Sequence, residues 1–400
     1  MEELGIDGTA PIYGFVSDNV LACGSAGMVA KVCDRPKLEA LLSTAKALEK
    51  EDVDGITVFV NPRSQKVALG VSDDAVLILG PDYDDAKKLK KQLVAMLKGE
   101  AEDNDPYENA LFKRAEAADA ILSLYIDLGV VPDAGWNYLK RYLEQSGQES
   151  PIDVEELQTF TYGVDIMAAD HIMNANLWIF SSDEDVQDRI NGLMQSVRKV
   201  DGTALSFFTS STILGMAMNF DGEAALESYE DRLNKVLAQA GDAAPMLAEV
   251  FKLIRLVDGN VLFALNDIMD SDGGMAVVTN GDEAAITKAM ADLGLSATTR
   301  NGKRFFSPGE WFPIRLCLSD KLFTATMMQD VEERLNGEDC SIDNLMLAKI
   351  RANRFTLFIN TQRSLATANE IGLASRRDLE TVEAALSEFF DKVHYLTITY

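Results

Sequence analysis

The residues best suited to binding a metal ion lie between two predicted strands, where three aspartates precede a pair of glycines. Calcium loops of the EF-hand type need oxygen ligands at positions 1, 3, 5 and 12 and a glycine at position 6. With Gly273 at position 6, Asp270 and Asp272 fall on positions 3 and 5, but Ile268 and Thr279 occupy positions 1 and 12. We therefore interpret this stretch as the turn of a β-hairpin and expect no metal site.

Catalytic triads and zinc sites need imidazole groups that converge on one point. The chain has only two histidines, His171 and His394, which lie far apart in the sequence. The hydroxyl-rich stretch 207–215 has no histidine or lysine nearby to activate a serine. The glycine-containing stretch 19–29 has neither GxGxxG spacing nor the Gly-Lys-Ser/Thr of a phosphate loop. We therefore expect no catalytic residue and no cofactor.

Two short stretches place aromatic side chains beside polar ones, as carbohydrate- and peptide-binding sites do. One contains Trp136 and Tyr138, and the other contains Trp311 and Phe312. These four are the candidate ligand-binding residues. Packing in a core is the alternative, because the chain has 18 Phe, 10 Tyr and 3 Trp residues, and such side chains are largely buried in folded proteins.

The chain is strongly acidic, with 64 acidic and 37 basic residues and a formal net charge of -27 at pH 7. A charge of this sign repels phosphate backbones and anionic lipid surfaces, which argues against a nucleic-acid partner. The excess of carboxylates keeps a hydrolase that relies on carboxylates alone as an alternative. No apolar run reaches the length of about 18 residues that predicts a transmembrane segment.

The four cysteines are Cys23, Cys33, Cys317 and Cys340, and none forms a CxxC pair. The first three lie in apolar runs, so we expect buried free thiols, with disulfides as the open alternative. The sequence around Cys23 resembles a lipoprotein cleavage site, but the residues before it lack the cationic start and unbroken apolar segment of a signal peptide. We expect no lipid anchor at Cys23.

The elements that would position these residues occur twice. A strand at 28–33 and a helix at 34–48 lead to a hairpin at 66–80; the same order recurs from 274, with a hairpin at 313–327. Met28 and Ser72 match Met275 and Ser319, each at an offset of 247 residues. Helical spacing of apolar residues after an Asp cap predicts the helices, and Asp- and Gly-containing turns predict the hairpins.

The sequence therefore predicts an α+β fold of duplicated β-hairpin/helix units, with largely antiparallel sheets and helices covering one face. The first copy is expected at 1–165, and the second, with an additional strand–helix segment, at 166–400. Strand 119–129 corresponds loosely to 353–362, and the last strand, from 394, to 157–167. The middle section has no counterpart near the start, so either an upstream segment is absent or the first copy is shorter.

Three stretches carry a resemblance to a known family. The opening GIDGTAPIYGFVSDN, the following DRPKLEALL and the later IRLVDGNVLFAL are similar to strand entries and helix starts of uncharacterised Bacteroides-type proteins. Many of these are regarded as envelope lipoproteins that contain a domain of unknown function. The resemblance implies a lipid-anchored envelope location, with the signal segment absent here, but it transfers no functional residue because the family has no established activity.

Together these features favour a non-catalytic binding or interaction protein of the bacterial cell envelope over an enzyme. The ligand is unknown, and a glycan or an envelope protein is the expected partner. The alternatives are a carboxylate-dependent hydrolase and a soluble cytoplasmic protein of unknown role.

Overall fold

The computed structural model describes residues 4–16, 26–63, 66–80, 86–100, 120–131, 133–146, 154–267, 272–309, 313–327, 342–370, 389 and 392–400. The chain divides into two compact units. The smaller unit comprises Met1–Phe112 and Gly129–Gln148, and the larger unit comprises Lys113–Leu128 and Glu149–Tyr400. Each is described by itself below. None of the described helices is both long and apolar enough to cross a membrane.

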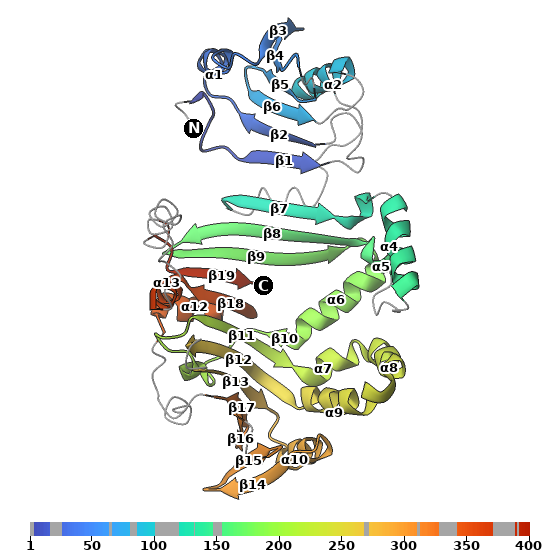
Figure 1. Cartoon of the computed structure of the whole chain (residues 1–400), viewed down its shortest axis with the longest axis vertical. Coiled ribbons are helices and arrows are strands. Elements are labelled where there is room, and N and C mark those ends of the chain that lie inside the picture. Colours follow the sequence, from blue (N-terminus) through green and yellow to red (C-terminus); the bar gives the residue numbers. More distant parts are fainter. Residues whose placement is uncertain are drawn as a thin grey trace. The chain divides into compact units, whose positions relative to one another are not determined.

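The smaller unit contains an antiparallel sheet with the strand order β1-β2-β6-β5-β4-β3 (Figure 1). Its strands are β1 (Ile12–Val16), β2 (Ala26–Lys31), β3 (Glu49–Val53), β4 (Ile56–Val60), β5 (Ala68–Val71) and β6 (Ala75–Gly80). Its helices are α1 (Arg35–Ser43), α2 (Ala86–Lys98) and α4 (Asp133–Ser146). Consecutive β4 residues face opposite sides: Val58 packs with residues of α2, and Phe59 packs with Leu38 of α1. One helix therefore covers each face of this sheet.

The larger unit contains one long sheet with the strand order β14-β15-β16-β17-β13-β12-β11-β18-β19-β9-β8-β7, and β10 pairs with β11 beside it. Every pairing is antiparallel except that of β19 with β9. The strands are β7 (Leu122–Asp127), β8 (Phe160–Ala169), β9 (Ile172–Ser181), β10 (Val197–Arg198), β11 (Leu214–Asp221), β12 (Val257–Asp267), β13 (Asp272–Thr279), β14 (Ser296–Arg300), β15 (Lys303–Ser307), β16 (Arg315–Ser319), β17 (Leu322–Thr326), β18 (Phe355–Asn360) and β19 (Tyr395–Thr399).

Helices connect many of these strands. They are α5 (Val154–Leu157), α6 (Glu184–Ser196), α7 (Gly222–Glu227), α8 (Glu230–Gln239), α9 (Ala244–Arg255), α10 (Glu283–Asp292), α12 (Asn344–Ala352) and α13 (Thr361–Glu370). The 3-10 turns are η3 (Leu128–Val130), η4 (Leu205–Phe207) and η5 (Gly241–Ala243). The fold class predicted from the sequence, α+β with largely antiparallel sheets, is confirmed.

Aspartates start several helices, as the sequence predicted. The carboxylate of Asp34 accepts a hydrogen bond from the backbone N–H of Lys37 (3.0 Å), and that of Asp282 accepts one from Ala285 (2.9 Å). Each carboxylate satisfies a backbone donor that the first helical turn leaves without a partner. These caps set where α1 and α10 begin.

The main core of the larger unit lies on one face of its sheet. Phe358 of β18, Ala217 of β11 and Leu262 of β12 pack there against Met346 and Ile350 of α12. The chain around Phe208, which follows η4, joins the same cluster. We call this side of the sheet the core face.

Two segments of the chain have the same strand order. Segment A (β1 to β6) is arranged as β1-β2-β6-β5-β4-β3, and segment B (β12 to β17) as β12-β13-β17-β16-β15-β14. The strands β3 and β14 start at Glu49 and Ser296, which keeps the predicted offset of 247 residues. The turn after β3 has positive φ angles at Asp54 (53°) and Gly55 (83°), and Asn301 (51°) and Gly302 (78°) repeat them. Such angles select Asn, Asp and Gly in tight hairpins.

The copies predicted at 1–165 and 166–400 divide the chain at a different place from the two units. The position between Asp165 and Ile166 falls inside β8, which pairs along its length with β9. Ladder hydrogen bonds between distant parts of the chain, rather than the sequence pattern, determine which strands share a sheet.

Candidate functional site

The feature that stands out is the face of the larger sheet opposite the core face. Residues that pair directly across neighbouring strands point to the same side, so the registers define this face. Its members are Leu122, Leu124 and Ile126 of β7, Tyr162, Val164 and Ile166 of β8, Ala175, Leu177 and Ile179 of β9, Leu396 and Ile398 of β19, Leu357 and Ile359 of β18, Leu214, Met216 and Met218 of β11, and Val261, Phe263 and Leu265 of β12. We call this set the apolar face.

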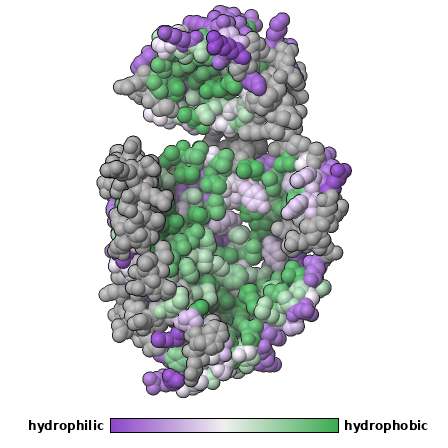
Figure 2. Space-filling view, in the orientation of Figure 1, coloured by the Kyte–Doolittle hydropathy of each residue, from purple (hydrophilic) through white to green (hydrophobic). Residues whose placement is uncertain are grey.

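The apolar face is partly open to solvent. Leu177 and Ile359, in the middle of the sheet, have exposed fractions of 40% and 39%, and Leu122, Leu124 and Ile126 at its edge have 52%, 55% and 54%. The other members except Tyr162, which is exposed, are half-buried. Figure 2 shows hydrophobic residues gathered over the strands of the larger unit.

Part of the larger sheet, at β8, β9 and β19, departs from the usual arrangement of a half-solvated sheet. Such a sheet places apolar side chains on the core and polar ones in water. In this sheet, Asn174, Thr397 and Thr399 are buried on the core face, where both threonine hydroxyls donate to Asn174 Oδ1 (2.6 and 3.0 Å). On the neighbouring strand pair, Asp165 is buried and accepts a hydrogen bond from Ser123 (2.7 Å). These polar groups are hydrogen-bonded inside, although the buried hydroxyl of Thr356 on the same face has no partner among the described residues, and apolar side chains remain exposed on the other face.

One end of the same side is covered. There Ile286 and Met290 of α10 pack on Phe306 and Leu318, with Leu253 of α9 beside them. No member of the apolar face, which extends from β12 to β7, belongs to this cluster. Contiguous exposed apolar surface of this kind marks sites that bind a partner or a hydrophobic ligand.

Two of the four candidate aromatic residues can be located. Trp136 and Tyr138 both lie on α4, but Trp136 is 7% exposed and Tyr138 is 74% exposed. Residues two positions apart on a helix point in different directions, so these two side chains do not form one flat platform. Trp311 and Phe312 lie outside the described residues. The binding role of all four stays a prediction.

The two histidines come together in space. The rings of His171 and His394 stack with centroids 4.4 Å apart and planes 8° from parallel. The backbone N–H of His394 donates to the carbonyl of His171 (2.8 Å) at the start of β19 and β9. Sequence separation had suggested that the imidazoles could not meet, and the pairing of β19 with β9 is what brings them together. The rings lie face to face, and the described residues contain no cluster of three metal-ligating side chains.

The cysteine prediction holds in part. Cys317 is a buried free thiol, as expected, but Cys33 is a free thiol that is exposed, so its predicted burial is wrong. Cys33 follows the last β2 residues and directly precedes the helix cap Asp34, where the chain leaves the sheet. Cys23 and Cys340 lie outside the described residues.

The aspartate-rich stretch serves as a hairpin connection. Asp267 ends β12 and pairs with Asp272, the first residue of β13. The residues between them, including Ile268 and Asp270, lie outside the described residues. The predicted hairpin is therefore confirmed by the two strands on either side.

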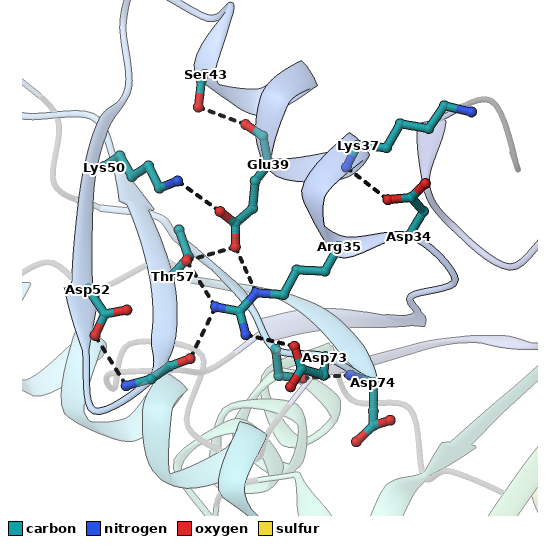
Figure 3. A network of polar contacts seen from close by, with 12 residues as sticks. Asp34, Arg35, Lys37, Glu39, Ser43, Lys50, Asp52, Thr57, Asp73 and Asp74 are labelled. Carbon is teal, nitrogen blue, oxygen red and sulfur yellow. Dashed lines mark hydrogen bonds and ion pairs between the residues drawn. The ribbon is translucent and has the colours of Figure 1, made fainter.

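A network of polar contacts lies in the smaller unit, around Glu39 (Figure 3). Glu39 accepts hydrogen bonds from Arg35 (2.7 Å), Lys50 (2.8 Å) and Thr57 (2.8 Å). Arg35 also donates to Asp73 (2.9 Å). Burial alone would raise the pKa of Glu39, but these hydrogen bonds and the charge of Lys50 outweigh it and lower the pKa to about 2.

This network is suited to holding α1 against the β3–β4 hairpin, not to acid catalysis. Hydrogen bonds from Thr9 likewise lower the pKa of Asp7 to about 2. A carboxylic acid that protonates a substrate near neutral pH needs a raised pKa. Glu39 and Asp7 both shift in the opposite direction.

Comparisons with known proteins identify no relative from which the fold or the function of this chain can be inferred. No family model matches the sequence, and no curated protein matches it. Two crystal forms of TP0453, III and I, share 13% and 11% identity with this chain, at TM-scores of 0.29 and 0.27. The matches cover 42% and 40% of this chain and 64% and 63% of TP0453, so the chain spans less than two-thirds of that protein. Scores this low support no conclusion about fold or function.

Proposed function

We propose that this protein is a non-catalytic binding protein whose binding surface is the apolar face of the larger sheet. The observation that carries the proposal is the exposure of apolar side chains on this face, opposite buried polar groups of β8, β9 and β19. The buried hydroxyls of Thr397 and Thr399 donate to Asn174 on the core face, while Leu177 and Ile359 remain exposed on the opposite face. Folding alone would favour burying these side chains, because full burial of a Leu or Ile gains about 1.5–3 kcal/mol and a side chain left about 40% exposed forgoes part of that gain.

The ligand that best fits this surface is an acyl chain. The backbone groups of the strands are already engaged in ladder hydrogen bonds, so the face offers few partners to a polar ligand. Among the members of the apolar face, Tyr162 alone carries a hydroxyl group. An acyl chain needs no hydrogen bonds, and the flexible side chains of Met216 and Met218 adapt to its shape. A glycan would require more hydrogen-bonding groups than this face supplies.

The cellular location is proposed as the bacterial envelope, on the strength of the resemblance of the opening residues to an envelope family. The net charge of -27 opposes docking of the whole protein on an anionic membrane surface. The proposal is therefore the capture of single lipid or fatty-acid chains.

Binding of a fluorescent fatty acid tests the proposal, with Leu177→Asp as the disrupting variant. An aspartate in the middle of the apolar face would place a charge against the acyl chain, and we expect at least a tenfold loss of affinity, or about 1.4 kcal/mol. Phe180→Asp is the matched control. Phe180 lies on the same strand, β9, with a similar exposed fraction (43%), but on the opposite side of the sheet.

Saturable binding that Leu177→Asp weakens and Phe180→Asp preserves would support the proposal. No saturable binding by the unmodified protein, or equal losses in both variants, would contradict it. Circular dichroism of both variants checks that the charge has not unfolded the sheet.

A further inference from the structure

The edge strand β7 differs from the edges β3 and β14. Its three apolar side chains, Leu122, Leu124 and Ile126, are more than half exposed, and Ile121 just before it is 70% exposed. Its pairing with β8 runs without a bulge. A flat edge strand with exposed apolar side chains is a template for an additional strand.

The edges β3 and β14 lack this character. The strand β3 reads Glu-Lys-Glu-Asp-Val, and its four charged residues are all exposed. The strand β14 reads Ser-Ala-Thr-Thr-Arg and is also exposed along its length. Charged and polar side chains protect such edges from pairing with another chain. The edge β7 is therefore more apolar than β3 and β14; the remaining edge, β1, reads Ile-Tyr-Gly-Phe-Val and is also apolar, with Ile12 43% exposed.

The larger sheet contains a second strand pair built like β7 and β8. The strands β18 and β19 are antiparallel, and their ladder ends where Asn360 pairs with Tyr395 and α13 begins. The ladder of β7 and β8 ends in the same way, where Asp127 pairs with Thr161 and η3 begins. Leu124 of β7 then corresponds to Leu357 of β18, and Ile126 corresponds to Ile359.

The outer edge of β18 shows what such a strand pairs with. The strand β11 runs antiparallel to it, with Leu214 opposite Ile359 and Met216 opposite Leu357. These four side chains all belong to the apolar face. An equivalent strand beside β7 would place apolar side chains next to Leu124 and Ile126 and would extend that face by one strand.

We propose that the edge of β7 binds an extended segment of another polypeptide that has the alternating pattern of β11. The segment would add an antiparallel strand, with its backbone hydrogen-bonded to β7 and its apolar side chains on the apolar face. A second copy of this chain is disfavoured as the partner, because each copy carries a net charge of -27 and two copies repel each other.

The probe is a peptide with the sequence of Leu214–Asp221, the strand β11 itself. Hydrogen exchange with mass spectrometry, on the full chain with and without the peptide, reports the amides of Leu122–Asp127. We expect exchange at β7 to slow at least tenfold with the peptide, because an added strand hydrogen-bonds the outward N–H groups. A scrambled peptide should leave it unchanged.

Two variants of the full chain locate the effect. Leu124→Lys places a charge on the edge, as natural edge strands do, and should abolish the protection by the peptide. Thr298→Lys is the matched control, since it places the same charge on β14, at the other end of the sheet, and should leave the protection intact.

Three outcomes would overturn the proposal. The first is an absence of protection at millimolar peptide, and the second is equal protection by the scrambled peptide. The third is a dimer in sedimentation experiments that Leu124→Lys dissociates, since the edge would then serve a second copy of the chain. The fatty-acid assay with Leu177→Asp is independent of this result, so the two proposals can fail separately.

Discussion

Segments A and B have the same strand order, but they attach their first helix to the sheet in opposite ways. In segment A the arginine is on the helix: Arg35 of α1 donates to Glu39 on the same helix and to Thr57 of β4. In segment B the arginine is on the strand: Arg304 of β15 donates to Thr287 of α10 and lies 3.8 Å from Glu283.

The apolar contact beneath these polar groups is the same in both segments. Leu38 lies four residues after the cap Asp34, Ile286 lies four residues after Asp282, and both side chains are buried. The comparison teaches that the buried aliphatic residue is common to the two segments. The polar contacts between helix and sheet differ, because the arginine can come from the helix or from the strand.

The largest expected effect comes from removing the shared apolar contact. Leu38→Ala and Ile286→Ala should each destabilise its own segment by about 2–5 kcal/mol, through lost burial and the cavity left behind. Hydrogen exchange followed by mass spectrometry measures the two segments separately in one molecule. The two contacts would not be equivalent if one substitution cost less than 1 kcal/mol while the other fell in the expected range.

The polar contacts should differ between the segments. Glu39→Gln removes a charge that accepts hydrogen bonds from Arg35 and Lys50, and should cost segment A about 1.5–3 kcal/mol. Thr287→Val removes one neutral acceptor from segment B and should cost about 1 kcal/mol. Denaturant unfolding monitored at each segment tests whether Glu39→Gln costs more than Thr287→Val. Equal costs would show that the charge of Glu39 adds nothing to the stability of segment A.

Acid should weaken segment A through Glu39. The pKa of this carboxyl is lowered from an ordinary 4.5 to about 2 in the folded protein, so its stabilisation is fully present above pH 4.5 and is lost as the pH falls toward 2. Thr287, at the corresponding place in segment B, has no proton to gain in this range. Exchange rates of β4 amides between pH 5 and 2, corrected for intrinsic exchange, measure the loss. Glu39→Gln should reduce it; an unchanged pH dependence in that variant would exclude Glu39 as its source.

The smallest effect should be the same in both segments. Gly55 and Gly302 have φ angles of 83° and 78°, and no atom lies within 4 Å of an added Cβ at either position. Gly55→Ala and Gly302→Ala should therefore each cost about 1 kcal/mol through backbone conformation alone. Thermal or denaturant unfolding of each variant gives the value, and a difference above 1 kcal/mol would mean that the turns are not equivalent.

The sequence determined the local elements of this protein and their recurrence. Aspartate caps, Asp-Gly and Asn-Gly turns and helical spacing act over a few residues, so the α+β class and the offset of 247 residues could be read directly. The same local signals placed the hairpin at Asp267 and Asp272, and the absence of an EF-hand calcium loop there stays a prediction.

Only the tertiary structure decided which strands share a sheet and which face of that sheet is covered. The alternation of Leu177 with Trp178 predicts two faces of β9, but not that α12 packs on the core face of the sheet and that Leu177, on the other face, stays exposed. The stacking of His171 on His394 likewise depends on the parallel pairing of β19 with β9. These are contacts between residues distant in the chain, and local propensity carries no information about them because they form only when the whole sheet assembles.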